Sequence, residues 1–284
     1  MKKIFSGFGL IIVILLGLYF LFPMPQKSIS DNEIINNFLA AHQNDARKIA
    51  VFDVDGTLMG QVPYYLADEV MLSMAATQNL SDVQKSVIKY MTETNDTSSD
   101  TYTRNRVKFF AGMTPRQMSE LGEKVWGEKY KGKVYPEMQN LVKKLMDNGY
   151  EIYAITCSPQ FVYQGVVNKY FGVPLQNVVG SRGIVKNGIM TNKVFEPFSC
   201  HGGKAEYIHK FIKDAPLIAG GNSSGDTAMV NTSQGLKIWV NPSEKIADEC
   251  KRDKNCIITN SADTDIGAPY TAQKYNIKRN TQHR

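Results

Sequence analysis

Two aspartates separated by one residue form the pair in this sequence that is best suited to chemistry. Asp53 and Asp55 follow an apolar run at 49–52 and precede the turn residue Gly56. Two carboxylates this close cannot both stay ionised in a partly buried site without a counter-charge. Mg²⁺ supplies such a charge, because it prefers carboxylate oxygens and keeps waters that a phosphate oxygen can replace. Beside the metal, Asp53 can attack phosphorus and Asp55 can transfer a proton.

Three later stretches add groups that a phosphoryl-transfer site needs. Thr156 follows an apolar run and offers a hydroxyl, with neighbouring backbone N–H groups, to a phosphoryl oxygen. Lys204 follows two glycines and brings a positive charge that can hold phosphate and shield Asp53. Asn222 and Asp226 are four residues apart after a glycine pair, and their oxygens suit Mg²⁺. A surface turn is the simpler interpretation of the first aspartate pair alone, and these later groups argue against it.

The four motifs, in this order, resemble those of the haloacid dehalogenase (HAD) superfamily of phosphohydrolases. The similarity covers about residues 48–240, and the helical insert between the first and second motifs is similar to the phosphoserine-phosphatase-like branch. The resemblance implies that Asp53 is the nucleophile and that Asp55 is the general acid and base. The resemblance also implies which residues bind the substrate phosphate, namely Thr156, Lys204 and Gly56, and which hold Mg²⁺, namely Asp53, the main-chain oxygen of Asp55, Asn222 and Asp226.

One residue departs from the family pattern. The last motif usually begins Gly-Asp, whereas this sequence has Gly221-Asn222. The amide oxygen of Asn222 can bind Mg²⁺ but carries no charge, so a lower metal affinity is expected. We expect an Mg²⁺-dependent phosphatase acting on a small phosphorylated metabolite, because Asp226 keeps the second acid. A non-catalytic binding protein with a weakened metal site, or phosphoryl transfer to another hydroxyl, remains as an alternative.

Short apolar stretches alternate with helical patterns, which predicts a parallel sheet covered by helices on both faces. In such a sheet the chemistry collects at the carboxyl ends of the strands. We therefore expect an α/β fold, a HAD-like (Rossmannoid) parallel sheet with an inserted helical cap. The expected strands are 49–52, 150–155, 178–179, 216–219 and, as the last, 236–240, with a small hairpin at 184–194.

The region between the first two motifs has a helical pattern, with Thr114 and Pro115 as a helix start. A cap inserted there would exclude water and select the substrate. The end of the chain, from about Thr271, is expected to be disordered. The expected division is a signal-anchor at 1–25, a core at 28–59 and 136–260, a helical cap at 60–135 and a polar tail at 261–284.

The ends of the chain carry much of its formal net charge of +6, so the core is not a strong basic field. No nucleic-acid-binding signature is present, which argues against nucleic acid as the main partner. Lys2 and Lys3 precede an apolar segment at 4–22 that is long enough to span a bilayer. Because the lysines should stay cytoplasmic, we expect export of the rest, either membrane-anchored or periplasmic after cleavage.

Export makes disulfides possible among the four cysteines. Cys250 and Cys256 enclose a polar loop, so a local disulfide is expected between them. Cys157 and Cys200 each lie near a candidate site residue. Either these two pair or Cys157 is a free buried thiol, and the sequence leaves both open.

Several side chains near the motifs have simpler structural interpretations. Ser158 precedes Pro159 and is expected to cap the next helix rather than to bind phosphate. His201 is expected to be incidental, as loop histidines usually are. Solvated helix faces are expected for Arg104, Arg106 and Arg116, and core packing, rather than a choline-like pocket, for Tyr64, Tyr65, Trp126 and Tyr130.

Overall fold

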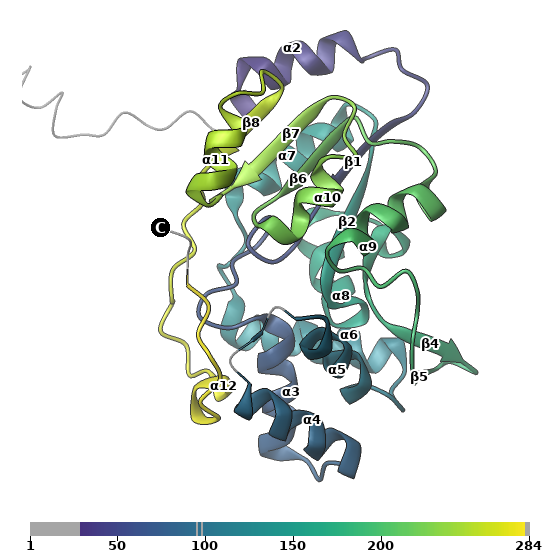
Figure 1. Cartoon of the computed structure of the whole chain (residues 1–284), viewed down its shortest axis with the longest axis vertical. Coiled ribbons are helices and arrows are strands. Elements are labelled where there is room, and N and C mark those ends of the chain that lie inside the picture. The colour runs from purple at the N-terminus through teal and green to yellow at the C-terminus, as the bar shows by residue number, and fades with distance from the viewer. Residues whose placement is uncertain (1–28, 95, 98, 282–284) are drawn as a thin grey trace, which may run out of the picture.

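A computed structural model describes residues 29–94, 96–97 and 99–281 of the chain. The expected N-terminal anchor at 1–25 therefore lies outside the described residues. Within the described part, no helix has the length and apolar character needed to cross a bilayer. The sheet and its helices form the upper part of the molecule in Figure 1, and the inserted helices form the lower part.

Six parallel strands form the central sheet, in the order β3-β2-β1-β6-β7-β8. The chain places β1 in the middle and adds strands outward on one side and then on the other. The strand order therefore reverses beside β1, which is where ligands bind in open α/β sheets. The strands are β1 (Lys48–Phe52), β2 (Tyr150–Pro159), β3 (Val178–Ser181), β6 (Ile218–Gly221), β7 (Leu236–Val240) and β8 (Cys256–Thr259).

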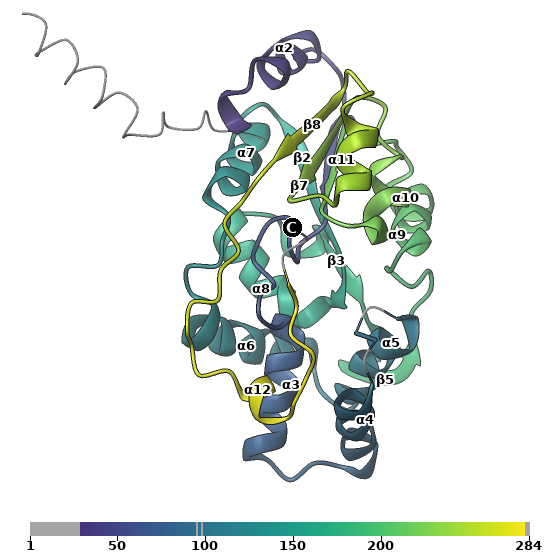
Figure 2. The same cartoon turned by 60° about the vertical axis from the view of Figure 1, so that its left-hand side comes forward.

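Alternate residues of β1 face opposite sides of the sheet, as the two-residue period of a strand requires. Ile49 and Val51 pack with apolar residues of η4 (Ile208–Ile212) and α10 (Thr227–Val230). Ala50 and Phe52 belong to the larger core, which includes residues of α7 (Pro136–Asp147) and α2 (Glu33–Ala41). Figure 2 shows α7 on one side of the sheet and α9 (Gly202–Tyr207), α10 and α11 (Glu244–Cys250) on the other. The predicted α/β fold with helices on both faces is confirmed.

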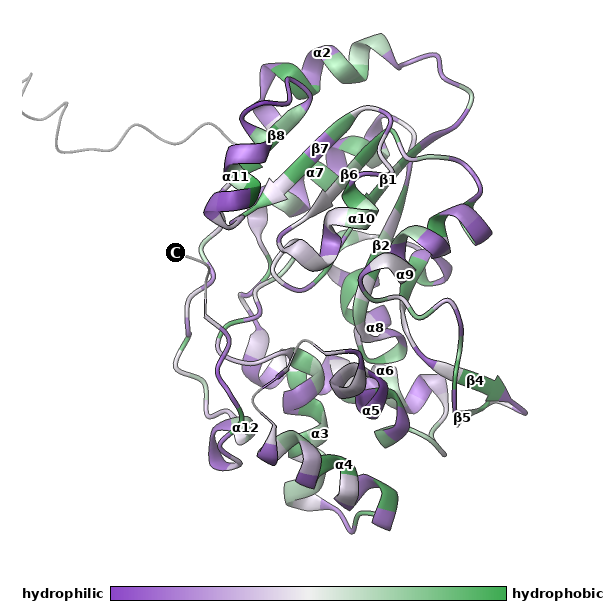
Figure 3. Cartoon of the chain, in the orientation of Figure 1, coloured by the Kyte–Doolittle hydropathy of each residue, from purple (hydrophilic) through white to green (hydrophobic). Residues whose placement is uncertain are grey.

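The inserted region between β1 and β2 is helical. Two of its helices begin with capping boxes, at Ser81 and Thr114. Each hydroxyl accepts a hydrogen bond from the backbone N–H of a glutamine three residues later, and the side chain of that glutamine accepts one from the backbone N–H of the capping residue. Figure 3 shows both apolar and polar residues along α3 and α4. The helix α4 buries one face, with Val87, Ile88 and Met91, whereas α3 is buried on all sides from Leu66 to Leu72. The helices are α3 (Leu66–Thr77), α4 (Asp82–Glu93), α5 (Asp100–Phe109), α6 (Pro115–Val125) and η2 (Trp126–Tyr130).

A small antiparallel hairpin supports these helices from the core side. It consists of β4 (Gly183–Lys186) and β5 (Ile189–Val194). The backbone N–H of Gly112 donates to the Met190 carbonyl at 2.8 Å, and the N–H of Met190 donates to the Met113 carbonyl at 2.9 Å. Other elements of the chain are η1 (Ile29–Asp31), α8 (Gln160–Phe171), η3 (Leu175–Asn177), α9 (Gly202–Tyr207) and η5 (Ser224–Asp226).

Two expectations about the C-terminal third are wrong. The strand at 236–240 is not the last, because α11 (Glu244–Cys250) leads into β8, which pairs with β7. The chain beyond Thr271 is not disordered as far as residue 281, since it forms α12 (Thr271–Lys274) and buries Ala272 and Ile277. Its few apolar residues are enough because they dock into a surface that the inserted helices provide, which a local reading of a polar segment does not reveal.

Candidate active site

Asp53 lies directly after β1, at the point where the strand order reverses. Lys204 reaches it from α9, with Nζ 2.5 Å from Asp53 Oδ1 and 2.7 Å from Asp226 Oδ1. The Thr57 hydroxyl donates to Asp53 Oδ2 at 3.1 Å. All four side chains are buried. Each Asp53 oxygen retains a second lone pair for a metal or for a phosphorus atom.

Gly56 allows the loop after β1 to approach the last motif closely. Its φ of +80° is one that side chains rarely adopt, and a Cβ built on it would lie 2.1 Å from Asn222 Nδ2. Its N–H donates to the Met59 carbonyl at 2.7 Å, so this N–H closes the turn within the loop. Gly56 therefore shapes the turn, and its proposed contact with phosphate stays a prediction.

Asp55 is held by two hydroxyl groups. Ser158 Oγ donates to Asp55 Oδ2 at 2.7 Å, and the Tyr163 hydroxyl donates to Asp55 Oδ1 at 2.9 Å. The expectation that Ser158 caps the next helix is wrong, because α8 has no side-chain cap and Ser158 points to Asp55 instead. Tyr163 was not anticipated, because a tyrosine inside an apolar helix looks like a core residue.

Burial strongly perturbs both aspartates. Burial and the neighbouring Asp226 raise the pKa of Asp53 to about 7, although Lys204 acts in the opposite direction. Burial raises the pKa of Asp55 to about 6, although its hydrogen bonds from Ser158 and Tyr163 lower it. Burial alone would lower the pKa of Lys204, but Asp226 and Asp53 raise it above its ordinary value. The lysine is therefore charged while the two acids are close to taking up a proton.

Asp226 organises the loop of the last motif. Its Oδ2 accepts hydrogen bonds from the N–H groups of Asn222 and Ser223 and from the Ser223 hydroxyl, each at 3.1 Å. Its Oδ1 accepts from Lys204. Asp226 therefore positions both the loop and the lysine. Asn222 is 6% exposed and lies beside Gly56, next to the first motif.

The side chains present fit a divalent cation. Three buried carboxylates lie together here: Asp53 and Asp226 pair directly with Lys204, whereas Asp55 is held by the two hydroxyl groups of Ser158 and Tyr163. Burial raises the pKa of both Asp53 and Asp55, and Asp226 adds to the effect at Asp53, so a hard cation bound beside them would favour their ionised forms. The oxygens of these residues and of Asn222 are the ligands that Mg²⁺ prefers.

Thr156 lies in the last part of β2, where the pairing with β3 shifts register, and not directly after the strand as the sequence predicted, because β2 continues to Pro159. Its Oγ1 accepts a hydrogen bond from the Ser158 N–H at 3.0 Å, and its side chain is buried beside the cavity. Its main-chain oxygen accepts from the Ser199 hydroxyl at 2.7 Å, which ties the end of β2 to the loop before α9. The same buried end of one cavity is therefore lined by all four predicted residues, namely Asp53, Thr156, Lys204 and Asp226.

These groups line a cavity of about 390 Å³ between the sheet and the inserted helices. That size suits a small ligand.

The expectation of a solvated Arg106 is wrong, because Arg106 is buried in the cavity wall and forms a two-pronged ion pair with Asp68 at 2.7 and 2.8 Å. Its guanidinium carbon lies 4.7 Å from the ring centroids of Tyr65 and Tyr102. Tyr65 lines the cavity, so the expectation of core packing is wrong for this residue. Core packing is confirmed for Tyr64, Trp126 and Tyr130.

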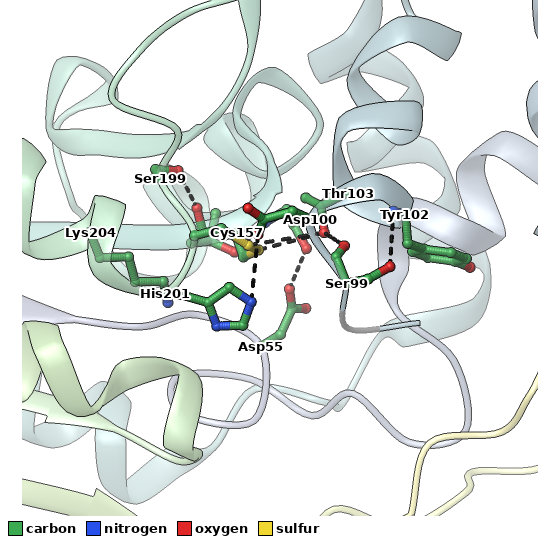
Figure 4. The surroundings of a disulfide bond; sticks show 12 residues. Asp55, Ser99, Asp100, Tyr102, Thr103, Cys157, Ser199, His201 and Lys204 are labelled. Atoms are coloured by element: carbon green, nitrogen blue, oxygen red, sulfur yellow. Dashed lines mark hydrogen bonds and ion pairs between the residues drawn. A yellow bond between two sulfur atoms is a disulfide. The ribbon is translucent and has the colours of Figure 1, made fainter. Parts of the chain in front are cut away.

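A disulfide joins Cys157, next to Thr156, to Cys200 in the loop before Lys204. Figure 4 shows this bond beside Thr103 of α5, with His201 turned towards Asp100. Cys200, His201 and Asp100 form a group close enough to share a metal, but the disulfide removes the thiolate that a metal would need. The second expected disulfide, Cys250–Cys256, is present as well.

The fold and the convergent acids and lysine define an α/β protein with a site built for phosphoryl chemistry. A family model described as haloacid dehalogenase-like hydrolase matches residues 50–230. The chain therefore belongs to the haloacid dehalogenase-like hydrolase family, as its four motifs indicated. The predicted class of enzyme, a hydrolase, is the class of this family.

Two solved structures with a TM-score of 0.60 share the fold at low sequence identity. A protein of unknown function from Bordetella pertussis Tohama I is 15% identical, with a TM-score of 0.60 over 75% of this chain and 98% of its own. A functionally unknown protein from Anaerococcus prevotii DSM 20548 is also 15% identical, with a TM-score of 0.60 over 81% and 94%. A substrate-bound phosphoserine phosphatase is 21% identical over 75% and 94%, with a TM-score of 0.47. No curated protein matches the sequence.

Proposed function

We propose that this protein hydrolyses a small phosphomonoester, with Mg²⁺ as cofactor and an aspartyl-phosphate intermediate on Asp53. The observation that supports the proposal is the convergence of Asp53, Asp55, Lys204 and Asp226 on one buried floor. Lys204 and the Thr156 hydroxyl supply the positive charge and the hydrogen bond that a phosphoryl group needs.

In the first step, an Asp53 carboxylate oxygen attacks phosphorus and the bond from phosphorus to the ester oxygen breaks. Asp55 gives its proton to that oxygen, so the substrate leaves as a neutral alcohol. The raised pKa of Asp55, about 6, makes a proton available close to neutral pH. Ser158 and Tyr163 hold the carboxyl in place by donating to both of its oxygens.

In the second step, water attacks the phosphorus of the acyl phosphate and Asp55, now ionised, takes a proton from it. The bond between phosphorus and Asp53 breaks, which releases phosphate and restores the carboxylate. Lys204 stays charged throughout because of its two acidic neighbours. A cap that excludes bulk water would confine this attack to a positioned water molecule.

Mg²⁺ would be held by Asp53, the main-chain oxygen of Asp55, Asn222 and Asp226, and Asp226 also supports the loop that carries Asn222. When bound, it would neutralise charge on the phosphoryl oxygens and keep Asp53 ionised. Because Asn222 is neutral where the family pattern has an acid, we expect weaker metal binding than an aspartate at position 222 would give.

The test is hydrolysis of phosphomonoesters by the purified chain with Mg²⁺. Asp53→Asn should lower kcat by about 10³-fold or more, since it removes the nucleophile. Asp82→Asn, at a fully exposed carboxylate of α4, is the matched control and should leave the rate unchanged. Full activity in Asp53→Asn would overturn the assignment.

Beryllofluoride, which mimics an acyl phosphate, distinguishes the alternatives. An enzyme that forms an aspartyl-phosphate should gain thermal stability from beryllofluoride only when Mg²⁺ is present and Asp53 is intact. A binding protein would bind phosphate without turnover, and a transferase would pass the phosphoryl group to an added alcohol in preference to water.

We also propose that the chain is exported and held at the membrane by residues 4–22, or periplasmic if that segment is cleaved. Support comes from the lysines before the apolar segment and from the pairing of all four cysteines, because disulfides persist in oxidising compartments. Digestion of the full chain by protease added outside intact inner membranes would support export. Complete protection there, with digestion after lysis, would contradict it.

A further inference from the structure

The chain after β8 leaves the core, crosses to the inserted helices and returns towards the cavity, as Figures 1 and 2 show. Apolar anchors hold this segment along its way. Tyr270 is buried, with its ring centroid 5.8 Å from that of Tyr64 and 5.6 Å from that of Tyr130. Ala272 and Ile277 are buried as well. We call residues 261–281 the C-terminal strap.

The strap first fixes the loop through which the chain passes from β1 to the inserted helices. Asp263 forms a buried ion pair with Lys133 at 2.8 Å. Its other oxygen accepts from the N–H groups of Gln61 and Val62, at 2.7 and 3.1 Å. Gln61 and Val62 follow the first motif by a few positions, so the strap fixes the segment that connects this motif to the inserted helices.

The strap then docks on the inserted helices through one buried carboxylate. Glu69 of α3 accepts hydrogen bonds from the N–H groups of Thr271 and Ala272, at 2.6 and 2.9 Å. Lys129 pairs with Glu69 and donates to the Thr271 hydroxyl at 2.7 Å. The short helix α12 is therefore tied to the cap by charge as well as by packing.

The last part of the strap returns to the mouth of the cavity. The N–H of Asn280 donates to the Pro63 carbonyl and its side-chain amide donates to the Gln61 carbonyl, both at 2.8 Å. These two bonds hold the strap end in register with the first motif. The strap residues that line the cavity are Lys278, Arg279, Asn280 and Thr281.

Charge is distributed unevenly along the cavity. The acidic side chains that line it are the buried residues Asp53, Asp55 and Asp226. Lys278 and Arg279 are exposed, and they bring positive charge to the opening. The Asp265 carboxylate partly balances this charge, because it pairs with Arg279 at 2.5 Å. A phosphoryl group bound beside Asp53 would leave the rest of the ester within the same cavity, whose lining includes Lys278 and Arg279.

We propose that the strap end, residues 278–281, is a specificity-determining wall that favours phosphomonoesters whose leaving group carries a second negative charge, such as a carboxylate. Lys278 and Arg279 would attract that charge, while Asn280 positions them. This inference rests on the proposed phosphatase function and adds to it the chemical class of the substrate.

The test compares two esters of similar length, the phosphate ester of 3-hydroxypropionate and propyl phosphate. The unmodified chain should have the higher kcat/KM for the first. In Lys278→Glu the ratio of the two kcat/KM values should fall about tenfold, because the charge facing the carboxylate is reversed. Lys278→Gln should lower it by a smaller factor. Lys274→Glu, on the same strap but outside the cavity lining, is the control and should keep the ratio.

Binding of two non-hydrolysable analogues separates this inference from the proposed function. Affinities for 3-phosphonopropionate and propylphosphonate, measured by calorimetry, should show the same preference and the same loss in Lys278→Glu. If no phosphomonoester is hydrolysed but this binding pattern appears, the proposed function fails and the inference about residues 278–281 stands. Equal ratios in the unmodified chain and in both Lys278 variants, each with an unchanged unfolding temperature, would overturn the wall.

Discussion

At the scale of single residues, Asp55 depends on the two hydroxyl groups that hold it. Ser158 and Tyr163 donate to different oxygens of the same carboxyl, at 2.7 and 2.9 Å. Both bonds stabilise the ionised form, while burial favours the protonated form. The balance leaves the pKa of Asp55 at about 6, in the range where one group can both give and take a proton.

Removing one donor should disturb that balance. In Tyr163→Phe the ionised form of Asp55 loses a hydrogen bond, so the pKa of Asp55 should rise and the pH–rate limb that it governs should move up by about half to one unit. The measurement is kcat against pH. Tyr150→Phe is the control, because Tyr150 lies at the other end of β2 and its hydroxyl has no hydrogen-bond partner among the described residues. An unchanged profile in Tyr163→Phe would contradict the positioning role.

The raised pKa values of Asp53 and Asp55, about 7 and about 6, predict how the stability of the metal-free chain depends on pH. Because folding raises both pKa values above 3.8, these groups contribute stability that is present in full below about pH 4. That contribution is lost progressively as the pH rises from about 4 through the folded-state pKa values of about 6 and about 7. The free energy of unfolding should therefore fall by about 1–3 kcal/mol over this window.

Denaturant titrations at several pH values measure this loss. Asp53→Asn should flatten the pH dependence, and Mg²⁺ should restore stability above pH 7 in the unmodified chain. A metal-free chain that gains stability between pH 4 and 7, after correction for the same trend in Asp53→Asn, would contradict the raised pKa values of these two buried carboxyl groups.

At the scale of elements, the Cys157–Cys200 disulfide joins the end of β2 to the loop before α9. These two segments carry Thr156 and Lys204, so the bond fixes the distance between two phosphate-binding candidates. Cys250–Cys256 closes a much shorter loop, with a separation of 6 residues against 43, and lies away from the cavity lining. The two disulfides therefore offer a matched comparison.

Replacing both members of each pair by serine should separate stability from activity. Loop-closure entropy predicts a loss of about 4 kcal/mol for Cys157→Ser with Cys200→Ser, and about 2 kcal/mol for Cys250→Ser with Cys256→Ser. The first double variant should also lose kcat, because Lys204 is less well positioned, whereas the second should keep it. Equal effects on kcat in the two variants would argue against a positioning role for the first disulfide.

At the scale of the whole molecule, the buried pair of Lys133 and Asp263 connects the strap, the cap and the loop after β1. Asp263→Ala should leave Lys133 buried without its partner, together with two unpaired N–H groups, so we expect a loss of about 3–5 kcal/mol in unfolding free energy. Asp265→Ala, two residues along the same strap and half-exposed, should cost about 1 kcal/mol or less. Chemical denaturation of both variants measures the difference, and similar losses would show that the strap is not anchored at Asp263.

The local sequence pattern was sufficient to predict the fold class. It was also sufficient to locate four residues that the structure brings to one cavity, namely Asp53, Thr156, Lys204 and Asp226. An apolar strand has a length and a residue type that can be recognised in a few positions, and the parallel arrangement then brings the strand ends together. The same reasoning predicted the inserted helices, because their capping residues and apolar spacing are local as well.

The sequence by itself determined the elements and the strand ends that carry the acids, because these depend on neighbours a few residues away. Only the tertiary structure decided what surrounds Asp55, since Ser158 and Tyr163 lie 103 and 108 residues from it along the chain. It also decided that a polar C-terminal segment becomes a strap. Pairings across such separations depend on how the packed elements meet, and no periodicity in the sequence records that.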